Sequence, residues 1–572
     1  MTRFRIEQLP FEAASLGAWR DSDRRHSNWP VVYALNGSTQ VYVGETLGGA
    51  GRLRQHLSAP SRRHLDTARV IIDDTFNKSV CLDLESYLIR LFAGDGKYEV
   101  LNANAGITDR DYYDREFYQE TFRTIFEELR SQGLFNGHIK DIENSDLFKL
   151  SPFKSLTEDQ AAAVVDIVEG LLDDLHTGRG STIIVRGDPG TGKTIVGIFL
   201  MKLLRDIQEI DLHDEFYAES MFSEFFLPDH AALLDGLRIG LVVPQQSLRD
   251  SIRKVFARTP RLSAGMVLTP YEVGLSDDRY DLLIVDETHR LNQRANQSSA
   301  AKNRQFGEIN RRLFGADELA TTQLDWIKAQ SDHQVFLLDA AQSVRPADLA
   351  TATLRELLDD ASTAGRVYPL RSQMRVQAGG DYIQYVRDLL TSRASTPRAF
   401  PGYDLRMFED LAAMRDAIHT RDAEHGLARL VAGYAWPWAS KNDKSKYDIM
   451  LDGCSLRWNR SEIDWINSKG SLEEVGSIHT VQGYDLNYAG VVIGGDLRYD
   501  PIGARLFADR TSYFDKKGME NNRKLGITYT DDDLLRYISN IYGVLMTRGM
   551  KGTYVYVVDP ALRAYLGGYI NT

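Results

Sequence analysis

The stretch GDPGTGKT at residues 187–194 decides the fold of most of this chain. It lies between an apolar, β-branched run, STIIVRG (181–187), and a helical pattern, IVGIFLMKLLRDI (195–207). A glycine-rich turn from a strand into a helix, closed by a Lys-Thr pair, is the P-loop arrangement, whose backbone N–H groups surround a phosphate. The residues expected to bind the nucleotide here are Gly187, Gly190, Gly192, Lys193 and Thr194.

The predicted roles within this loop follow from the chemistry of its side chains. The Lys193 ammonium supplies positive charge to the β- and γ-phosphates, and the Thr194 hydroxyl is a ligand for Mg²⁺. A second apolar run, YDLLIV, ends directly in Asp286 and Glu287. We expect Asp286 to be a further Mg²⁺ contact and Glu287 to be the base that orients the attacking water. A purely structural role, in which both carboxylates cap the next helix, is the alternative, and their pairing with a P-loop disfavours it.

The order of the elements predicts several domains. Beyond residue 155, short apolar runs alternate with helical patterns, which is typical of parallel sheets covered by helices on both faces. These runs form two sets, predicting one domain at 156–355 and another at 356–572. Ahead of them, residues 28–110 indicate a small α/β domain and residues 111–155 a helical connector that ends in a linker. The expected fold class is therefore a multidomain α/β protein.

From LTEDQ at 156–160 to the strand TYVYVVD that ends at residue 559, the motifs resemble those of the superfamily 1 helicases in order and spacing. The resemblance implies two RecA-like domains, ATP as the cofactor with Mg²⁺, and a nucleic acid as the partner. It implies that Gln160 reads the adenine and that Gln342, in FLLDAAQSVRP, senses the γ-phosphate. In LRSQMRV (370–376) it nominates Arg375 as a phosphate contact, with Arg371 as the alternative.

The last two motifs of this resemblance lie near the C-terminus. GSIHTVQGYDL (476–486) resembles the motif that couples nucleic acid to nucleotide, which implies roles for Gln482 and Gly483. VLMTRGMKGTYVYVVD (544–559) resembles the motif whose arginine reaches the γ-phosphate, so Arg548 is the expected arginine finger.

A finer resemblance concerns the Schlafen-like ATPases with a domain of unknown function of the 2075 class. It is carried by the helical insert after Asp286, by GYAWPW (433–438) and by LMTRGMKG. Trp436 and Trp438 are candidates for stacking on bases, although aromatic residues beside a proline more often pack on the domain surface. The long polar inserts at 205–237 and 288–330 depart from the pattern of translocating helicases, so we predict ATP hydrolysis without predicting duplex unwinding.

The N-terminal part contains a second candidate site. The stretch VVYALNGSTQVYVGET (31–46) resembles the hairpin of the GIY-YIG nucleases, with Tyr33 and Tyr42 on either side of an Asn-Gly turn. Arg52 and His56 follow at the family's spacing, Glu85 interrupts the apolar stripe of a predicted helix, and YEVLNANAG nominates Asn102, with Asn104 as the alternative. Two features depart from the family: Val31 stands in place of its first glycine, and the loop between the halves is short.

The resemblance implies a metal-dependent cleavage of phosphodiester bonds. Glu85 would hold Mg²⁺ or Mn²⁺ as a Lewis acid, and Arg52 would neutralise the equatorial oxygens of the transition state. A tyrosine would accept the proton of the attacking water, and the sequence does not decide between Tyr33 and Tyr42. The alternative is a small hairpin domain whose tyrosines are simply buried.

Composition limits the remaining choices. The chain has 572 residues, a net charge of −12 and two cysteines far apart in sequence. No run of apolar residues is long enough to span a membrane, and the N-terminus shows no secretory signal, so we expect a cytoplasmic protein without a membrane partner. The negative total charge does not exclude local basic grooves for phosphate contacts.

These observations leave three active hypotheses and one inactive one. The first is an ATP-dependent endonuclease acting on DNA, in bacterial defence against phage or in repair. The second is an ATPase that acts as a sensor and not as a motor: it senses nucleotide and restrains the nuclease, as a homo-oligomer or with a partner protein from a defence system. The third takes RNA, for example tRNA, as the substrate, and we favour DNA. A nucleotide-binding scaffold with an inactive nuclease domain is the remaining alternative.

Overall fold

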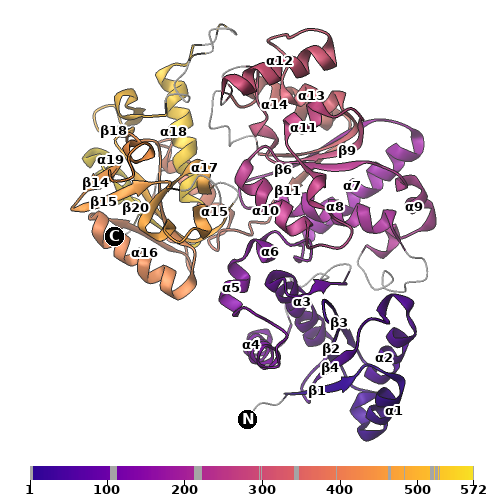
Figure 1. The fold of residues 1–572 in the computed structure, drawn as a ribbon. Helices are drawn as coiled ribbons and strands as arrows, with labels where there is room; N and C mark the ends of the chain where they lie inside the picture. Colours follow the sequence, from indigo (N-terminus) through magenta and orange to yellow (C-terminus); the bar gives the residue numbers. More distant parts are fainter. Residues whose placement is uncertain are drawn as a thin grey trace. The chain divides into compact units, whose positions relative to one another are not determined.

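The structure is a computed structural model, and Figure 1 shows its fold. It describes residues 4–102, 112–210, 222–294, 297, 299–339, 347–394, 396–460, 465–481, 484–515, 521, 526 and 528–570. The chain forms two compact units, each discontinuous in sequence. The first comprises Met1–Gly178, Ile195–Leu237 and Ser251–Met266, and the second comprises Arg179–Thr194, Arg238–Asp250 and Val267–Thr572.

A five-stranded mixed sheet forms the N-terminal domain. Its strand order is β1 (Phe4–Pro10), β4 (Thr67–Asp73), β2 (Val31–Asn36), β3 (Gln40–Thr46) and β5 (Glu99–Val100). Neighbours pair antiparallel except for β5, which runs parallel to β3. The predicted hairpin is therefore present as β2 and β3. The sheet also includes β1, which precedes the predicted start at residue 28, because Phe4 to Pro10 pair in register with β4.

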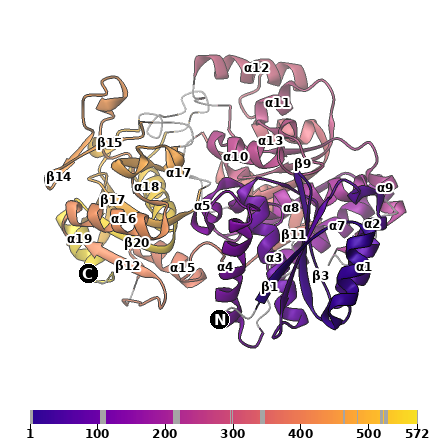
Figure 2. The same cartoon turned by 60° about the horizontal axis from the view of Figure 1, so that its bottom comes forward.

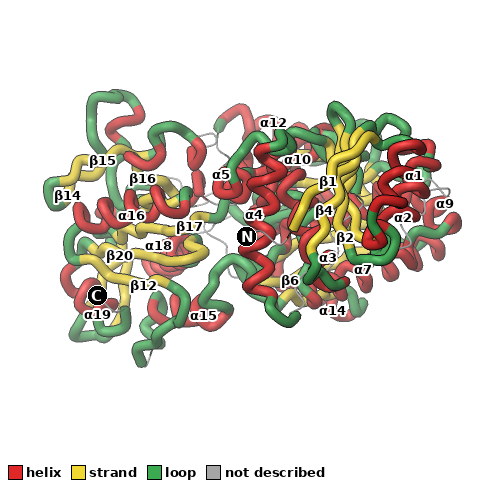
Figure 3. The backbone as a smooth tube through the Cα atoms, turned by 90° about the horizontal axis from the view of Figure 1, so that it is seen from below, coloured by secondary structure: helices red, strands yellow, loops and turns green. Residues whose placement is uncertain are grey.

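Helices cover both faces of this sheet (Figure 3). On one face lie α1 (Ala13–Ser22) and α2 (Gly49–Ser58), and on the other lie α3 (Lys78–Asp95) and α4 (Arg115–Ser131). Successive strand residues alternate between the two cores, as the pleat of a strand requires: Tyr33 and Tyr42 belong to the core with α1 and α2, whereas Val32 belongs to the core with α3 and α4.

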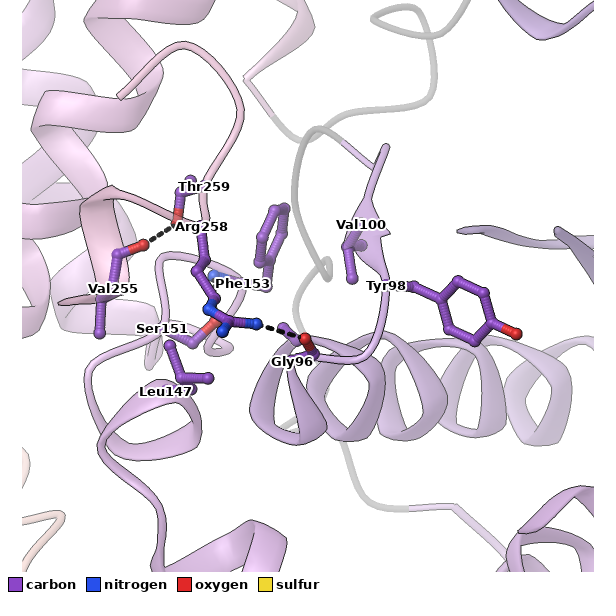
Figure 4. Close-up of a pocket in the computed structure, with 10 residues that line it drawn as sticks. Gly96, Tyr98, Val100, Leu147, Ser151, Phe153, Val255, Arg258 and Thr259 are labelled. Atoms are coloured by element: carbon purple, nitrogen blue, oxygen red, sulfur yellow. Dashed lines mark hydrogen bonds between the residues drawn. The ribbon is translucent and has the colours of Figure 1, made fainter. Parts of the chain in front are cut away.

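The segment predicted as a connector packs against the C-terminal end of α3. It contains α5 (Ile139–Asn144) and α6 (Asp146–Lys149), and the Ser145 hydroxyl before α6 donates to the Gly94 carbonyl at 3.0 Å. Within the same unit, Arg258 Nη1 donates to the carbonyl oxygen of Gly96, the residue that caps α3, at 2.6 Å (Figure 4). The Ser251 hydroxyl donates to the Asp146 carboxylate at 2.6 Å. These bonds join the N-terminal domain to the segment 251–266.

The first RecA-like domain is built on a six-stranded parallel sheet. Its strand order is β11 (Val367–Leu370), β6 (Ser181–Gly187), β10 (Ser331–Leu338), β9 (Tyr280–Val285), β7 (Ile239–Val242) and β8 (Val267–Leu268). On one face its apolar side chains form a core with α11 (Pro270–Leu275), α13 (Gln323–Ala329) and α14 (Thr351–Thr363). Strand β10 lies between β6 and β9, so the loops after these three strands meet at one edge of the sheet.

The second RecA-like domain has a seven-stranded sheet. Its order is β12 (Asp404–Phe408), β20 (Gly549–Val557), β17 (Leu486–Ile493), β13 (Ala428–Ala432), β16 (Glu474–Ser477), β15 (Cys454–Trp458) and β14 (Ile449–Leu451). All pairs are parallel except β14 with β15. Helix α16 (Leu411–His425) covers one face, and α15 (Gly380–Leu389), α18 (Asp531–Met546) and α19 (Pro560–Gly567) pack in the core on the other (Figure 2).

The predicted fold class is confirmed: a small mixed-sheet domain is followed by two parallel-sheet RecA-like domains. The remaining helices and strands are α7 (Glu158–Thr177), α8 (Lys193–Gln208), α9 (Pro228–Leu234), α10 (Gln246–Phe256), α12 (Ala300–Phe314), α17 (Ile478–Val481), β18 (Leu497–Asp500) and β19 (Arg505–Ala508). None of the helices in the described ranges is long and apolar enough to cross a membrane. Cys81 and Cys454 are both buried thiols.

Candidate active sites

The P-loop follows β6 and enters α8, as the sequence predicts. Gly190 and Gly192 have φ values of 85° and 79°, in the left-handed region that favours glycine. A Cβ atom on Gly190 would lie 2.2 Å from Oε1 of Gln373, so a side chain has no room there. The Lys193 ammonium donates to the carbonyl oxygens of Gly187 at 2.7 Å and Asp188 at 2.9 Å. The Lys193 ammonium thus lies against the backbone of the loop itself.

Two buried carboxylates reach the same place from neighbouring strands. The Thr194 hydroxyl donates to Oδ2 of Asp286, directly after β9, at 2.8 Å. Burial raises the pKa of Asp286 to about 6, and the charge of Glu287 adds to the rise. Asp339, directly after β10, has its Oδ2 atom 3.8 Å from the Lys193 ammonium. The three strand ends therefore bring a lysine, a hydroxyl and two carboxylates together.

Glu287 has an unusual backbone and a close histidine neighbour. Its φ of 49° lies in the left-handed region, which is costly for a residue with a side chain. Its Oε2 atom lies 3.0 Å from Nε2 of the fully buried His289. Burial acts to raise the pKa of Glu287, but His289 and the charges of Arg290 and Lys193 outweigh it, so the pKa lies well below its usual range. Glu287 is therefore ionised beside a carboxyl of higher pKa.

The second RecA-like domain adds two arginines to this charge cluster. Arg375 forms an ion pair with the Asp485 carboxylate, whereas Arg371 is exposed. Arg548 is buried and donates through Nη1 to the Tyr484 carbonyl at 3.2 Å. Burial, with the charge of Arg375, lowers the pKa of Arg548 to about 9, against the opposing charges of Asp485 and Glu287. Arg375 and Arg548 are thus within electrostatic reach of each other.

A segment after β11 touches the P-loop directly. The Gln373 amide donates to the Pro189 carbonyl at 2.7 Å, and the backbone N–H of Met374 donates to the Gly190 carbonyl at 3.0 Å. From α15, Arg387 donates to the Asp188 carboxylate at 2.8 Å. The conformation of the P-loop is therefore tied to residues 373–387, which lead into the second domain.

Of the other predicted residues, three are packed inside their own domains and four lie outside the described residues. The Gln160 side chain is fully buried and accepts from the backbone N–H of Thr157 in a capping box at the start of α7. Trp436 and Trp438 pack against the core beneath α16, as the surface-packing interpretation expects. Gln342, Gln482, Gly483 and Asn104 lie outside the described residues.

The N-terminal domain gathers the predicted aromatic and basic residues around Tyr33. The Tyr33 hydroxyl lies 2.6 Å from Nε2 of His56, on α2. The ring centroids of Tyr33 and Tyr42 are 6.2 Å apart, and that of His56 lies 5.5 Å from the first and 5.2 Å from the second. All three side chains are nearly fully buried, at 1%, 5% and 3% exposure. The hairpin and α2 thus form one compact cluster.

Charges from two helices act on the Tyr33 hydroxyl. Burial raises the pKa of Tyr33 well above its usual value, Tyr42 and Glu85 add to the rise, and Arg52 and Arg62 oppose it. Arg52 and Glu85 are half-buried, on α2 and α3. Burial together with the charges of Arg62 and Arg52 lowers the pKa of His56 to about 2, so its imidazole is neutral.

Two further residues hold the hairpin in this geometry. Gly44 pairs with Tyr33 across the hairpin, and a Cβ atom there would lie 2.4 Å from the Tyr33 hydroxyl. The Asn102 side chain binds both backbone groups of Val43: its Oδ1 accepts from the N–H at 3.1 Å and its Nδ2 donates to the carbonyl at 2.8 Å. Asn102 therefore anchors the chain after β5 to the hairpin.

Three residues of these sites were not among the predicted ones. Asp339 could have been found from the signal that located Asp286, a carboxylate directly after an apolar strand, here HQVFLL. Gln373 and Arg62 carry no such signal, because their contacts are with residues far away in the chain or across a turn. Arg62 lies in the basic stretch RLRQHLSAPSRRH (52–64), where a solvated loop is the ordinary expectation, yet it is 3% exposed.

The oxygen ligands suit Mg²⁺ better at one site than at the other. Thr194 and Asp286 offer a hydroxyl and a carboxylate next to Lys193, a set that fits a Mg²⁺ ion shared with a nucleotide. Among the described residues there is no group of three or more His, Cys, Asp or Glu side chains that could hold a metal. An ion at Glu85 would therefore have one protein carboxylate, with water and substrate phosphate completing its shell, as Mg²⁺ sites allow.

Comparison with known proteins identifies relatives of the ATPase part. Residues 180–559 match the family described as Schlafen group 3, DNA/RNA helicase domain. The uncharacterized protein YPL245W of Saccharomyces cerevisiae is 26% identical over 418 residues, 67% of this chain and 83% of that protein. Two structures of the Pif1 helicase from Bacteroides, one with ADP-AlF3 and ssDNA and one with ssDNA, match with TM-scores of 0.25 and 0.24 at 11% and 10% identity. Each covers 70% of this chain and 92% of its own.

Proposed function

Because this chain belongs to the Schlafen group 3 DNA/RNA helicase family and is a helicase-like ATPase, we propose that it couples ATP to the cleavage of a nucleic acid by its N-terminal domain. The proposed enzyme is a GIY-YIG-type endonuclease joined to an ATP hydrolase. We propose DNA as its substrate, with RNA as the alternative to be tested, and DNA repair or bacterial defence against foreign DNA as its setting.

In the ATPase part, the proposed chemistry follows the geometry of the P-loop edge. Lys193 neutralises the β- and γ-phosphates, and Thr194 with Asp286 binds the Mg²⁺ that accompanies ATP. Glu287, which is ionised, orients the water that attacks the γ-phosphate. Arg548 and Arg375, the arginines of the second RecA-like domain, neutralise the charge that develops in the transition state.

In the N-terminal domain, one observation carries the nuclease proposal: Tyr33, Tyr42 and His56 are in contact, and the charges of Arg52 and Glu85 act on the same hydroxyl. A domain that only buried its tyrosines would not need an arginine and a glutamate from two different helices beside them. Arg52 would bind the scissile phosphate, and Glu85 would hold the divalent ion that polarises it.

A second candidate, a nucleotide sensor that restrains the nuclease, is favoured by the contacts of Gln373, Met374 and Arg387 with the P-loop. Because the P-loop contacts the second domain, binding of a nucleotide to the loop would change these contacts without ATP hydrolysis. The two candidates differ in one outcome. Loss of nucleotide binding abolishes ATP-dependent cutting by a motor-type enzyme, whereas it releases cutting by a restrained one.

The experiment is a cleavage panel with the purified full-length chain. Supercoiled plasmid, linear duplex, single-stranded DNA and tRNA are incubated with Mg²⁺ or Mn²⁺, with and without ATP. Glu85→Gln is compared with Glu127→Gln, which removes an exposed carboxylate of the same domain. We expect at least one substrate to be cut by the wild type and by Glu127→Gln and to survive Glu85→Gln. Equal cutting by Glu85→Gln and the wild type would overturn the nuclease proposal, and so would no cutting under any condition.

A further inference from the structure

The helix that carries Arg52 belongs to a stretch of the chain without acidic residues. Residues 48–64 contain four arginines, two histidines and no aspartate, glutamate or lysine, whereas the whole chain has a net charge of −12. The stretch forms α2 and the single 3₁₀ turn Pro60–Arg62 that follows it. Positive charge is therefore concentrated on the helix whose Arg52 is the proposed partner of the scissile phosphate.

The packing of α2 turns part of this charge toward solvent. Ala50, Leu53 and His56 are buried at a spacing of three residues, which is the spacing of one face of an α-helix. The exposed residues of the helix are Gly51, Arg54, Gln55 and Ser58. Arg52 is half-buried. The outer face of α2 is therefore polar, and its charged residue is Arg54.

The turn after α2 places a second arginine at the surface. Arg62 is 3% exposed, and its guanidinium carbon lies 3.7 Å from the centroid of the Tyr42 ring. Leu65 is also 3% exposed and belongs to the core beside α2. Between these two buried residues, Arg63 and His64 are exposed. Arg63 is therefore held at the surface by an anchor on either side.

Arg54 and Arg63 have no hydrogen-bond or ion-pair partner among the described residues. Within residues 4–102 and 112–131, each of the other arginines except the exposed Arg24 donates a hydrogen bond or forms an ion pair. The charge of Arg54 acts on Asp21 of α1, but that carboxylate is paired with Arg20 at 2.6 Å. The guanidinium groups of Arg54 and Arg63 thus keep their N–H donors for a ligand.

The chemistry of this surface suits the backbone of duplex DNA. A guanidinium presents a planar fork of donors that fits two phosphate oxygens, and residues 48–64 offer no carboxylate that would repel them. The exposed residues of this stretch include no large apolar side chain to anchor a protein or a membrane. They also include no Phe, Tyr or Trp, the residues on which unpaired bases stack.

We propose that Arg54 and Arg63 bind backbone phosphates of duplex DNA that flank the phosphate held by Arg52. The inference rests on the proposed nuclease function and deepens it, because it names the surface that receives the substrate. Contacts to phosphate carry no base information, so this surface sets the affinity and the placement of the strand without reading its sequence. Arg62 supports the turn from the inside and does not contact the substrate.

The first test locates the DNA on the full-length chain without cleavage. Ser58 is exposed on α2, and Thr124 is exposed on α4, on the opposite face of the sheet. Both natural cysteines are buried thiols, so Ser58→Cys and Thr124→Cys can each be labelled selectively with a benzophenone maleimide. Each labelled protein, with Glu85→Gln added to prevent cutting, is irradiated with a radiolabelled linear duplex.

We expect a cross-link from position 58 and none above background from position 124. Adding Arg54→Gln and Arg63→Gln should remove most of the cross-link from position 58. Equal yields from the two positions would overturn the proposal, and so would a yield from position 58 that survives both substitutions. Parallel samples contain single-stranded DNA or tRNA. A cross-link to either of these and not to the duplex would overturn the assignment to duplex DNA.

The second test measures the affinity for a fluorescent duplex by anisotropy over a range of salt concentrations. Each lost phosphate contact should lower the slope of log K against log salt by about 0.9, which corresponds to about eightfold weaker binding at about 0.1 M salt. The double variant Arg54→Gln, Arg63→Gln should therefore lose about twice that slope. Arg123→Gln, which removes an exposed arginine of α4, is the matched control and should keep the slope of the wild type.

A double variant with the slope and affinity of the wild type would overturn the proposal. If the cleavage panel shows no cutting of any substrate, the proposed function fails, while the cross-link and the salt slope still decide whether this surface binds DNA. If the wild type cuts duplex DNA and the double variant binds and cuts it equally well, the proposed function stands and the inference about Arg54 and Arg63 fails.

Discussion

At the scale of single residues, the ATPase site separates the pKa values of two adjacent carboxyls. Asp286 is raised to about 6 by burial and by its charged neighbour, whereas Glu287 is held low by His289, Arg290 and Lys193 against the effect of burial. Environments that separate the pKa values of neighbouring carboxyls are typical of sites where each carboxyl has its own chemical role. Here the ionised Glu287 suits a base, and Asp286 suits a metal ligand that ionises fully when Mg²⁺ binds.

We predict that Glu287→Gln lowers kcat for ATP hydrolysis by about 10²–10⁴-fold, the usual contribution of a positioned base, while nucleotide still binds. The amide keeps the size of the side chain but cannot take a proton from water. The measurement is steady-state phosphate release together with binding of a fluorescent ATP analogue. Glu308→Gln, an exposed carboxylate of the same unit, is the control and should keep full activity. Full hydrolysis by Glu287→Gln would assign the base elsewhere.

A second buried acid lies outside both sites. Asp496 follows β17, accepts from the Tyr542 hydroxyl at 2.7 Å through Oδ1, and has no hydrogen-bond partner for Oδ2 among the described residues. Burial, with the charge of the nearby Asp509, raises its pKa to about 7. Between pH values of about 3.9, the pKa of Asp496 in the unfolded chain, and its folded pKa, the folded state therefore binds a proton that the unfolded state has released.

The direction in which stability changes with pH follows from this difference in proton binding. The stability that Asp496 contributes is fully present below the unfolded pKa and is lost as the pH rises through about 7. We predict that Asp496→Asn, which cannot ionise, is more stable than the wild type at pH 8.5 by about 1–3 kcal/mol, with a smaller difference at pH 5.5. Urea unfolding at the two pH values measures this. Asp532→Asn replaces an exposed acid, so its stability relative to the wild type should be the same at both pH values. An equal stability difference between Asp496→Asn and the wild type at both pH values would contradict the raised pKa of Asp496.

At the scale of elements, the hairpin of β2 and β3 depends on one glycine. Gly44 faces Tyr33 across the pair, where a Cβ atom would come within 2.4 Å of the hydroxyl, while a Cβ atom on Gly51 in α2 would meet nothing within 4 Å. We predict that Gly44→Ala lowers the free energy of unfolding of the N-terminal domain by about 1–3 kcal/mol, the usual cost of overpacking. Gly51→Ala is the matched control and should be neutral or stabilising by up to about 1 kcal/mol. Equal unfolding midpoints for the two variants would mean that Tyr33 does not occupy this position.

The elements that sequence predicts best are those whose signal is contiguous. The P-loop and the Asp286-Glu287 pair each lie within one strand and its following turn, so a short pattern contains all the information. Strand β1 lacks this property, because FRIEQLP is short and ends in proline, and its place is fixed by pairing with β4. Arg62 was missed for a related reason. Its burial depends on a 3₁₀ turn that folds back onto α2, and nothing in a run of basic residues indicates this.

At the scale of the whole molecule, two sets of contacts within the first unit attach other segments to the end of α3. The Arg258 and Ser251 bonds attach a segment that lies between strands β7 and β8 of the first RecA-like sheet to the end of α3, the helix that carries Glu85. The connector helices α5 and α6 pack on the same helix end, and Phe153 joins its core. The fold class was predictable from the alternation of strands and helices, whereas these bonds were not, because each joins residues remote in sequence.

The most direct test of coupling is the nucleotide dependence of cleavage by Lys193→Ala beside the wild type. Cleavage of the substrate from the panel is timed with no nucleotide, with ATP and with a non-hydrolysable analogue. Our account predicts that ATP accelerates cutting by the wild type and has no effect on Lys193→Ala, which stays at the rate without nucleotide. If both proteins cut at one rate in all three conditions, the ATPase does not control the nuclease, and the central claim is wrong.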